Sequence, residues 1–71
     1  MILKRLRNLR EDHDMTQKDV AEMLHMSQTG YGKYETGENE IPLAPLIFLA
    51  EFYMVSVDYL LGLTNIKERN Y

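Results

Sequence analysis

The chain is predicted to be an all-α domain of five short helices. Apolar residues recur at spacings of three and four along most of its length, which is the period of a helix with one buried face. Hydroxyl residues stand directly before three of these segments, where they can cap the first free amides of a helix. The chain has 71 residues and no cysteine. It is therefore expected to form one small domain without disulfides or thiolate metal sites.

The first helix is predicted to run from Ile2 to Glu11, with apolar residues on one side (Ile2, Leu3, Leu6 and Leu9). Its basic residues lie in an amphipathic helix and not before an apolar block, so no signal peptide is expected. The longest apolar run, Leu43 to Ala50, is interrupted by Pro45 and is too short to span a bilayer. We expect a soluble, cytoplasmic protein without a membrane partner.

The next two helices are predicted to form a pair joined by a tight turn. Thr16 precedes one of them, whose apolar residues Val20, Ala21 and Leu24 share a face. Ser27 precedes the other, residues 28–36, which places Tyr31 and Tyr34 on its inner side. Gly37 follows it at a position where a left-handed residue commonly ends a helix.

After this pair, residues 38–44 are expected to form a loop, because Pro42 disfavours helix at the residue before it. Pro45 suits the first turn of a fourth helix that ends near Tyr53. Ser56 is expected to cap a fifth helix, Val57–Leu61, which Gly62 ends. We expect a domain over residues 1–62 and a short polar tail over residues 63–71, frayed from Asn65 onwards. The expected core is Leu6, Leu9, Val20, Ala21, Leu24, Tyr31, Tyr34, Leu46, Leu49, Ala50, Val55, Leu60 and Leu61.

The outer side of residues 28–36 has side chains that are suited to contacting the edges of DNA bases. Gln28, Thr29, Gly32 and Lys33 form a nearly continuous polar face. A glutamine offers a donor and an acceptor together, as the edge of adenine requires, and a lysine reaches guanine acceptors or a phosphate. On an isolated helix the same face could simply be solvated. Gly30 and Gly32 are unusual within a short helix, because glycine weakens helices. They could allow close packing or a close approach of DNA, or they could simply belong to a helix of low stability.

Several segments in order resemble the phage-repressor and Cro-like family of helix-turn-helix transcription regulators. The resemblance begins with LKRLRNLR at Leu3 to Arg10 and covers roughly residues 2–62. It continues through Thr16, Gln17, Val20, Ala21 and Leu24; Ser27, Tyr31, Tyr34, Glu35 and Gly37; Pro42; and Leu46, Leu49, Ala50, Tyr53, Val55, Ser56, Asp58, Leu60 and Leu61. The resemblance implies a compact five-helix, lambda-repressor-like DNA-binding domain with its helix-turn-helix at the second and third helices.

The resemblance also implies roles for individual residues. Gln17 would bind a phosphate and could brace the first residue of the recognition helix, although it could also be an ordinary polar residue at a helix start. Arg10 and Glu35 would form an interhelical ion pair, the alternative being two surface charges. Asp14 and His25 stand in turns where the family commonly has glycine, and both types tolerate left-handed conformations. The expected DNA-binding residues are Thr16, Gln17, Ser27, Gln28, Thr29, Gly32, Lys33 and Asn39.

Apolar residues at the end of the chain suggest a two-fold dimer. The chain has more large apolar residues than one small core needs, namely Leu43, Phe48, Phe52, Tyr59, Leu63 and Ile66, and some of them could simply cover the back of the domain. The family commonly dimerises, so the set on the fifth helix and its exit, Tyr59, Leu63 and Ile66, is the expected interface. We therefore expect a homodimeric repressor that binds a palindromic operator on double-stranded DNA and associates with the nucleoid.

Charge is the feature that fits DNA binding least. The formal net charge is −3, whereas DNA-binding domains are usually basic. Glu38 and Glu40 would repel a phosphate backbone. These acids favour an alternative, a protein-interaction module or antitoxin-like partner that retains the fold. No catalytic residues or cofactor are expected, since no nucleophile is paired with a base and no phosphate-binding loop is present. His13 and His25 have no recognised metal-site spacing.

Overall fold

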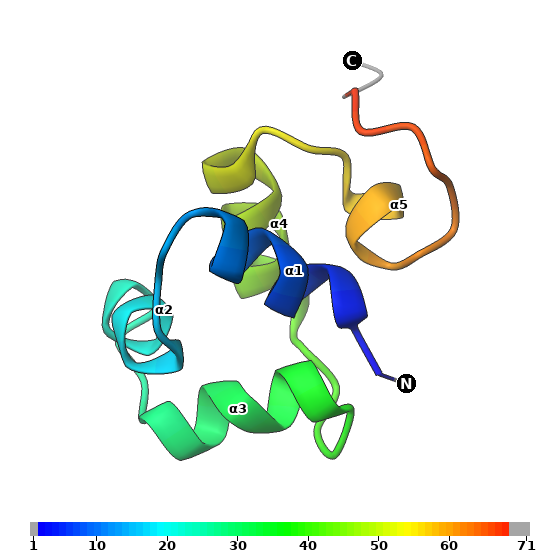
Figure 1. The fold of residues 1–71 in the computed structure, drawn as a ribbon. Helices are drawn as coiled ribbons and strands as arrows, with labels where there is room; N and C mark the ends of the chain where they lie inside the picture. Colours follow the sequence, from blue (N-terminus) through cyan, green and yellow to red (C-terminus); the bar gives the residue numbers. More distant parts are fainter. Residues whose placement is uncertain (1, 69–71) are drawn as a thin grey trace. The chain divides into compact units, whose positions relative to one another are not determined.

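The computed structural model describes residues 2–68, and within this range it contains five helices and no strand, which confirms the all-α class (Figure 1). The helices are α1 (Lys4–Asp12), α2 (Gln17–Met23), α3 (Gln28–Thr36), α4 (Leu43–Tyr53) and α5 (Val57–Leu60). The chain divides into two units, of which the first contains α1 to α3 and the second α4 and α5. The proposed limit of the domain at residue 62 stays a prediction.

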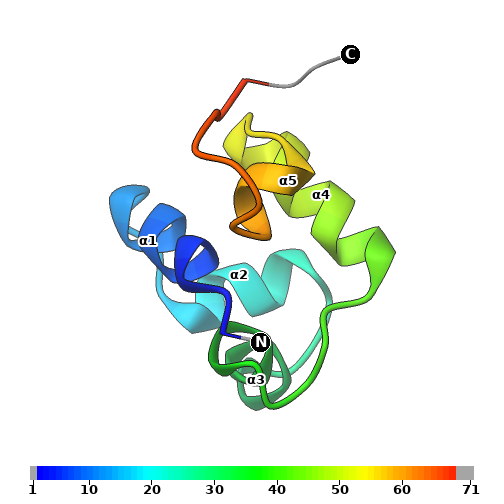
Figure 2. The same cartoon turned by 90° about the vertical axis from the view of Figure 1, so that its right-hand side faces the viewer.

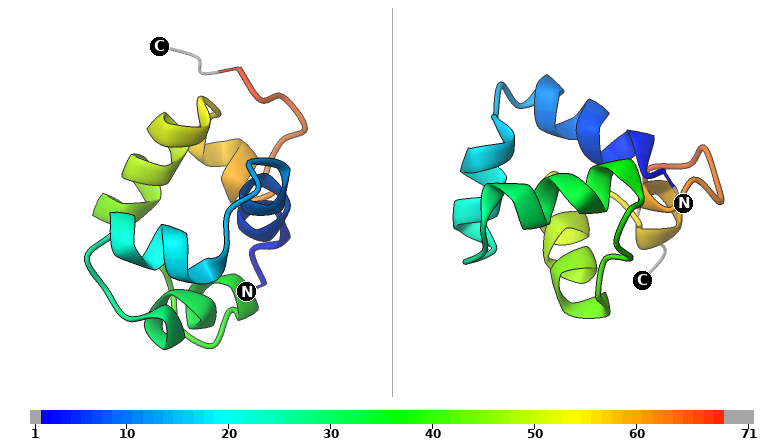
Figure 3. Two further views of the ribbon diagram at one scale, coloured as in Figure 1. Left: turned by 60° about the vertical axis from the view of Figure 1, so that its left-hand side comes forward. Right: turned by 90° about the horizontal axis from the view of Figure 1, so that it is seen from below.

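The first unit, up to residue 40, brings α1 and α2 against α3 (Figure 3). Its buried apolar side chains are Leu3, Leu6, Leu9, Val20, Ala21 and Tyr31. Ile2 is exposed, contrary to the predicted apolar face, because the helix begins only at Lys4. Leu24 and Tyr34, expected in the core, are only half-buried.

The turns of this unit adopt the left-handed conformations that the sequence suggested. Asp14 and His25 have φ angles of 55° and 56°, and Gly37 has a φ of 83° as the C-cap of α3. Non-glycine residues adopt this region at some cost in strain, which Asp, Asn and His bear better than most. The predicted helix–turn–helix connection is therefore present without a glycine in its turn.

The second unit begins its helix earlier than expected. Pro42, with extended backbone angles, is the N-cap of α4, so that the predicted loop ends before Leu43 and not at Ala44. Pro45 still falls within the first turn, where a missing N–H breaks no intrahelical bond. The buried side of α4 carries Leu46, Leu49, Ala50 and Tyr53. Tyr53 was missing from the predicted core.

The end of the second unit is more ordered than the sequence suggested. The Ser56 hydroxyl caps α5 by accepting a hydrogen bond from the backbone N–H of Tyr59 at 2.9 Å. The chain then turns at Gly62 and comes back, so that the Ser56 N–H donates to the Lys67 carbonyl at 2.8 Å (Figure 2). The expected fraying is therefore wrong for residues 65–67, and residues 69–71 of the predicted tail lie outside the described residues. Helix α5 ends at Leu60, one residue early, and Leu61 is half-buried.

Candidate nucleic-acid interface

Helix α2 starts with a reciprocal cap. The Thr16 hydroxyl accepts a hydrogen bond from the Asp19 N–H at 3.1 Å, and the Asp19 carboxylate accepts one from the Thr16 N–H at 2.9 Å. These bonds to Thr16 hold the pKa of the exposed Asp19 below its usual value. They also fix the position of the first turn, from which Thr16 and Gln17 were predicted to meet DNA.

Helix α3 starts in a similar way. The Ser27 hydroxyl accepts a hydrogen bond from the Gly30 N–H at 3.0 Å. Thr16 and Ser27 are both exposed, so capping does not remove their hydroxyls from solvent. A phosphate contact by either residue remains a prediction.

The two faces of α3 differ as the sequence predicted. Tyr31 is fully buried and Glu35 nearly so on one side. On the other side Thr29 and Lys33 are exposed, and Gln28 is exposed at the start of the helix. These three side chains can therefore be reached by a ligand as large as a DNA duplex.

Sequence reasoning missed Thr36, which continues the outward face. It lies three residues after Lys33 and seven after Thr29, so helix geometry places all three on the same side. Thr36 is exposed, and its hydroxyl donates to the Lys33 carbonyl at 3.3 Å. The helical period alone would have been sufficient to include it.

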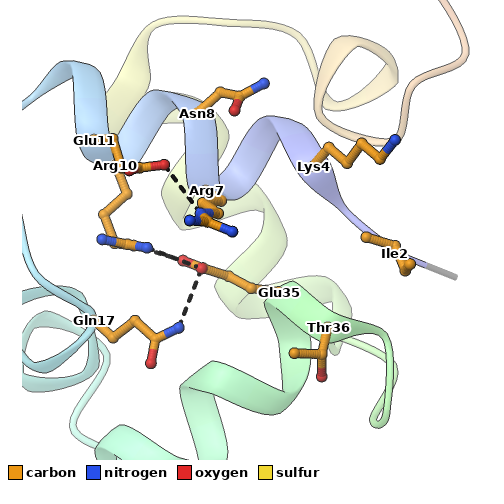
Figure 4. Close-up of a pocket in the computed structure, with 9 residues that line it drawn as sticks. All are labelled: Ile2, Lys4, Arg7, Asn8, Arg10, Glu11, Gln17, Glu35 and Thr36. Carbon is orange, nitrogen blue, oxygen red and sulfur yellow. Dashed lines mark hydrogen bonds and ion pairs between the residues drawn. The ribbon is translucent and has the colours of Figure 1, made fainter.

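The predicted ion pair between Arg10 and Glu35 is present and joins α1 to α3 (Figure 4). The Arg10 Nε and Nη2 atoms donate to the two Glu35 carboxylate oxygens at 2.7 and 3.1 Å. Arg10 Nη1 also donates to the Met15 carbonyl at 2.9 Å. The side chains of the pair are only 12% and 4% exposed, so the alternative of two independent surface charges is wrong.

The pair is electrostatically favourable despite its burial. Burial raises the pKa of Glu35, but hydrogen bonds from Arg10, Tyr31 and Gln17 outweigh it, so the net pKa lies below its ordinary value. The hydrogen bond to Glu35 raises the pKa of Arg10. Both groups therefore remain charged near neutral pH.

Gln17 braces α3 at a residue that the sequence did not suggest. Its Nε2 donates to Glu35 Oε1 at 3.3 Å, as Figure 4 shows, and the side chain is half-buried. This contact links the start of α2 to the same carboxylate that holds α1. Whether Gln17 also meets a phosphate stays a prediction.

The two glycines of α3 are explained by close packing. A Cβ atom on Gly32 would lie 3.1 Å from the Gln17 Oε1 atom, and one on Gly30 would lie 3.0 Å from the Ser27 hydroxyl oxygen. At either position an added methyl group would push against a side chain that already has a structural role. Close approach of α2 to α3 accounts for Gly32 without any ligand.

An open groove of about 730 Å³ runs between α1 and α3, next to the ion pair. Lys4, Arg7 and Asn8 line its α1 side, and Thr36 lines its α3 side (Figure 4). Arg7 forms an exposed ion pair with Glu11 at 3.0 Å. Two basic groups of the groove, Arg7 and Arg10, are therefore paired with its acidic lining residues Glu11 and Glu35.

The loop after α3 combines one amide with two acids. The Asn39 backbone N–H donates to the Lys33 carbonyl at 3.2 Å, and its side chain is exposed. Glu38 accepts a hydrogen bond from the Thr36 hydroxyl at 3.3 Å, which keeps this carboxylate close to the end of α3. Glu40 is exposed. The repulsive groups that the sequence predicted are therefore present beside Asn39.

The predicted dimer residues lie in the second unit. Leu63 and Ile66 are exposed, while Tyr59 is half-buried and has the Lys67 ammonium 5.8 Å from its ring centre. Their role in dimerisation stays a prediction.

A candidate metal site and a membrane-spanning helix are both absent from residues 2–68. No group of three or more histidine, cysteine or acidic residues there is arranged to hold a metal ion. The His13 Nδ1 atom instead lies 2.8 Å from the Leu9 carbonyl. No helix in the same range has the length and apolar character that crossing a membrane requires.

Comparison with known proteins agrees with this geometry. Residues 6–60 match a family model described as helix-turn-helix. The HTH-type transcriptional regulator YobD of Bacillus subtilis, described as uncharacterized, is 45% identical over 65 residues, which span 92% of this chain and 58% of YobD. The HTH-type transcriptional regulator ImmR of the same organism is 34% identical over 67 residues, which span 94% of this chain and 53% of ImmR.

A third relative comes from a phage. The cryptic phage CTXphi transcriptional repressor RstR of Vibrio cholerae is 36% identical over 61 residues, which span 86% of this chain and 54% of RstR. The chain thus spans little more than half the length of these relatives. No solved structure matches it significantly.

The family match includes all of α2 and α3, the two helices whose outward residues suggested DNA recognition. The members named above are transcriptional regulators or repressors. This chain belongs to the Cro- and phage-repressor-like helix-turn-helix family, a family of DNA-binding transcription regulators and not of enzymes.

Proposed function

We propose that this chain is a sequence-specific transcription regulator that inserts α3 into the major groove of an operator. The observation that carries the proposal is the outward face of α3. Thr29 and Lys33 are exposed there and Gln28 is exposed at the helix start, while the buried Tyr31 and Glu35 anchor the helix. A rigid helix that presents an amide, a hydroxyl and an ammonium group is suited to reading base edges.

The start of α2 supplies the second part of the proposed interface. Thr16 and Gln17 stand at its first turn, where free backbone N–H groups and the helix dipole attract a phosphate. Together with Ser27 and Asn39, these residues would fix the register of the protein on DNA. Gln28, Thr29 and Lys33 would then read the sequence.

We further propose that two copies bind a palindromic operator as a homodimer. The exposed Leu63 and Ile66, together with the half-buried Tyr59, form the proposed contact between the copies. Two recognition helices would then enter successive major grooves about 34 Å apart. Repression would follow from occupation of a promoter. RstR, one of the relatives, is named as a repressor.

Selection from random duplexes, followed by fluorescence anisotropy on the selected operator, tests the proposal. A bidentate contact to a base is worth about 1–3 kcal/mol, so Gln28→Ala should weaken operator binding by roughly five- to 150-fold. Lys33→Ala should weaken binding and lower the dependence of log K on log salt concentration by about one unit if it contacts a phosphate. Equal, sequence-independent affinity for all variants would exclude α3 as the reader.

The acidic loop favours a second candidate, a protein-interaction module of the antitoxin type. Residues 1–40 carry six basic and eight acidic residues, a balance of −2. In the DNA-binding proposal, Glu38→Gln with Glu40→Gln removes repulsion and should raise DNA affinity, most strongly at low salt. A protein partner that copurifies with the native chain and is lost from the same double variant, with DNA affinity unchanged, would favour the second candidate.

A further inference from the structure

Helix α4 carries apolar residues on both of its faces. Glu51 is the only charged residue among its eleven positions. One face is buried through Leu46, Leu49, Ala50 and Tyr53. The opposite side, called the outer face of α4, consists of Leu43, Ala44, Ile47, Phe48, Glu51 and Phe52. Helices that are apolar all round are normally buried all round, so the outer face calls for a partner.

The exposure of this face is substantial. Leu43 is 68% exposed, Ile47 39%, Phe48 44% and Phe52 40%. With roughly 200 Å² for a fully exposed ring, the two phenylalanines leave about 170 Å² open to solvent. Leu43 and Ile47 add a comparable area, so one chain offers on the order of 350 Å² of apolar side chain, the size of a functional patch.

The arrangement of residues on the outer face points to a second copy of this chain. At 100° per residue, Ala44 and Glu51 lie along the middle of the face, with Leu43 and Ile47 on one side and Phe48 and Phe52 on the other. If two such faces meet antiparallel, with the two-fold axis between residues 47 and 48, each Glu51 lies opposite the partner's Ala44. The small alanine leaves room for the carboxylate.

Charge also fits this orientation. Ala44 belongs to the first turn of α4, which has no side-chain cap and no acidic residue. The free N–H groups of that turn and the positive end of the helix dipole attract an anion. A partner's Glu51 carboxylate would supply one, and the two helix dipoles would run in opposite directions. A membrane surface fits less well, because helices that lie on membranes are rich in lysine and arginine and α4 has neither.

We propose that the outer face of α4 pairs antiparallel with the same face of a second copy. This surface is distinct from the contact proposed at Tyr59, Leu63 and Ile66, and it does not depend on DNA binding. A two-fold pair buries on the order of 700 Å² from the four apolar side chains, below the range of about 1,200–2,000 Å² for stable interfaces. The association is therefore weak and reversible, and it allows two DNA-bound dimers to contact each other.

Sedimentation equilibrium from about 10 µM to about 1 mM, a range suited to weak association, measures the pairing. Ile47→Lys should weaken self-association at least tenfold, and so should Leu43→Lys, whose site is so exposed that folding is not at risk. Circular dichroism verifies the fold of both. Glu51→Lys places a cation against the first turn of the partner's α4 and should also weaken self-association. The control Glu22→Lys makes the same change at an exposed glutamate on α2 and should leave self-association unchanged. Leu63→Lys should leave this association intact.

A cross-linking experiment tests the orientation, because the native chain has no cysteine. In the antiparallel pair, the two copies of residue 47 lie beside the axis, whereas the two copies of residue 43 are separated by about 13 Å along the helices. Disulfides require Cα atoms within about 7 Å. Ile47→Cys should therefore oxidise to a dimer and Leu43→Cys should not. Two results would overturn the proposal. One is a native chain whose self-association is unchanged by Ile47→Lys, whether the chain is a monomer or a dimer held by the contact at Tyr59, Leu63 and Ile66. The other is equal cross-linking of Ile47→Cys and Leu43→Cys.

Discussion

Replacing Glu35 by glutamine should remove a large part of the stability of this protein. The variant keeps the size of the side chain and abolishes its charge, so that the Arg10 side chain, only 12% exposed in the native protein, loses its counterion. Breaking a buried pair by removing one partner costs about 3–5 kcal/mol. We expect about 3 kcal/mol, since the glutamine oxygen still accepts one bond and Arg10 keeps its bond to the Met15 carbonyl.

This cost converts into a large change in melting temperature. At about 2.1 cal/mol/K per residue, the unfolding entropy of a chain of this length is roughly 150 cal/mol/K, so 3 kcal/mol lowers the Tm by about 20 °C. The total stability expected of such a chain is only about 4–11 kcal/mol. Urea unfolding followed by far-UV circular dichroism measures the free energy directly, and a thermal scan provides the second value.

The neighbouring pair of Arg7 and Glu11 provides the matched control. Its side chains are 68% and 53% exposed and its contact is 3.0 Å long. Glu11→Gln removes the same carboxylate from an exposed helical pair and should cost no more than about 0.5 kcal/mol. In addition, Arg10→Met combined with Glu35→Leu should recover much of the lost stability, because no buried charge remains unpaired. A Glu35→Gln variant within about 1 kcal/mol of the native protein would refute the importance of the pair.

Three further predictions concern stability. Gly32→Ala should leave the free energy of unfolding nearly unchanged, because a gain of about 1 kcal/mol in helix propensity offsets the lost Gln17–Glu35 hydrogen bond of similar size. In a Gln17→Ala background, Gly32→Ala should stabilise the protein by about 1 kcal/mol in urea unfolding. The same effect in both backgrounds would contradict the contact between residue 32 and Gln17. Met54→Gly should raise the free energy of unfolding by about 0.5–1 kcal/mol, because glycine adopts the left-handed conformation of residue 54 without strain. Gly62→Ala should lower the free energy of unfolding by about 1 kcal/mol for the converse reason. If both variants changed the stability in the same direction, this account of strain would be wrong. Because the pKa of Glu35 is lower in the folded state, the contribution of this carboxylate to the free energy of unfolding is complete above its ordinary pKa of 4.5 and declines as the pH falls below that value. The free energy of unfolding of Glu35→Gln, measured as a function of pH, should therefore depend less on acid than that of the native protein.

Much of the first unit could be predicted because its signals are local. The caps at Thr16 and Ser27 and the apolar spacing after each are contained within one or two helical turns. The Arg10–Glu35 pair was also expected, but only through the family resemblance, since 25 residues separate the two. The contact of Gln17 with Glu35 and Gly32 was missed, because it depends on how closely α2 approaches α3.

The second unit shows where sequence reasoning was insufficient. Pro45 was expected near a helix start, but Pro42 also fits that role as an N-cap, and the sequence did not distinguish their positions. Met54 adopts a left-handed conformation that its residue type does not favour, so no local signal marked it. The polar composition after residue 64 indicated a frayed tail. The hydrogen bond between Ser56 and Lys67 joins residues eleven apart and could not be read from composition.

The most direct test of the central claim is a double-mutant cycle between Gln28 and the base pairs of the selected operator. Anisotropy would give the affinity of the native protein and of Gln28→Ala for the operator and for single base-pair substitutions. If α3 reads DNA, one or two positions should show a coupling energy of about 1–3 kcal/mol with Gln28 and the remaining positions none. Additive effects at every position, with no coupling anywhere in the operator, would contradict the claim.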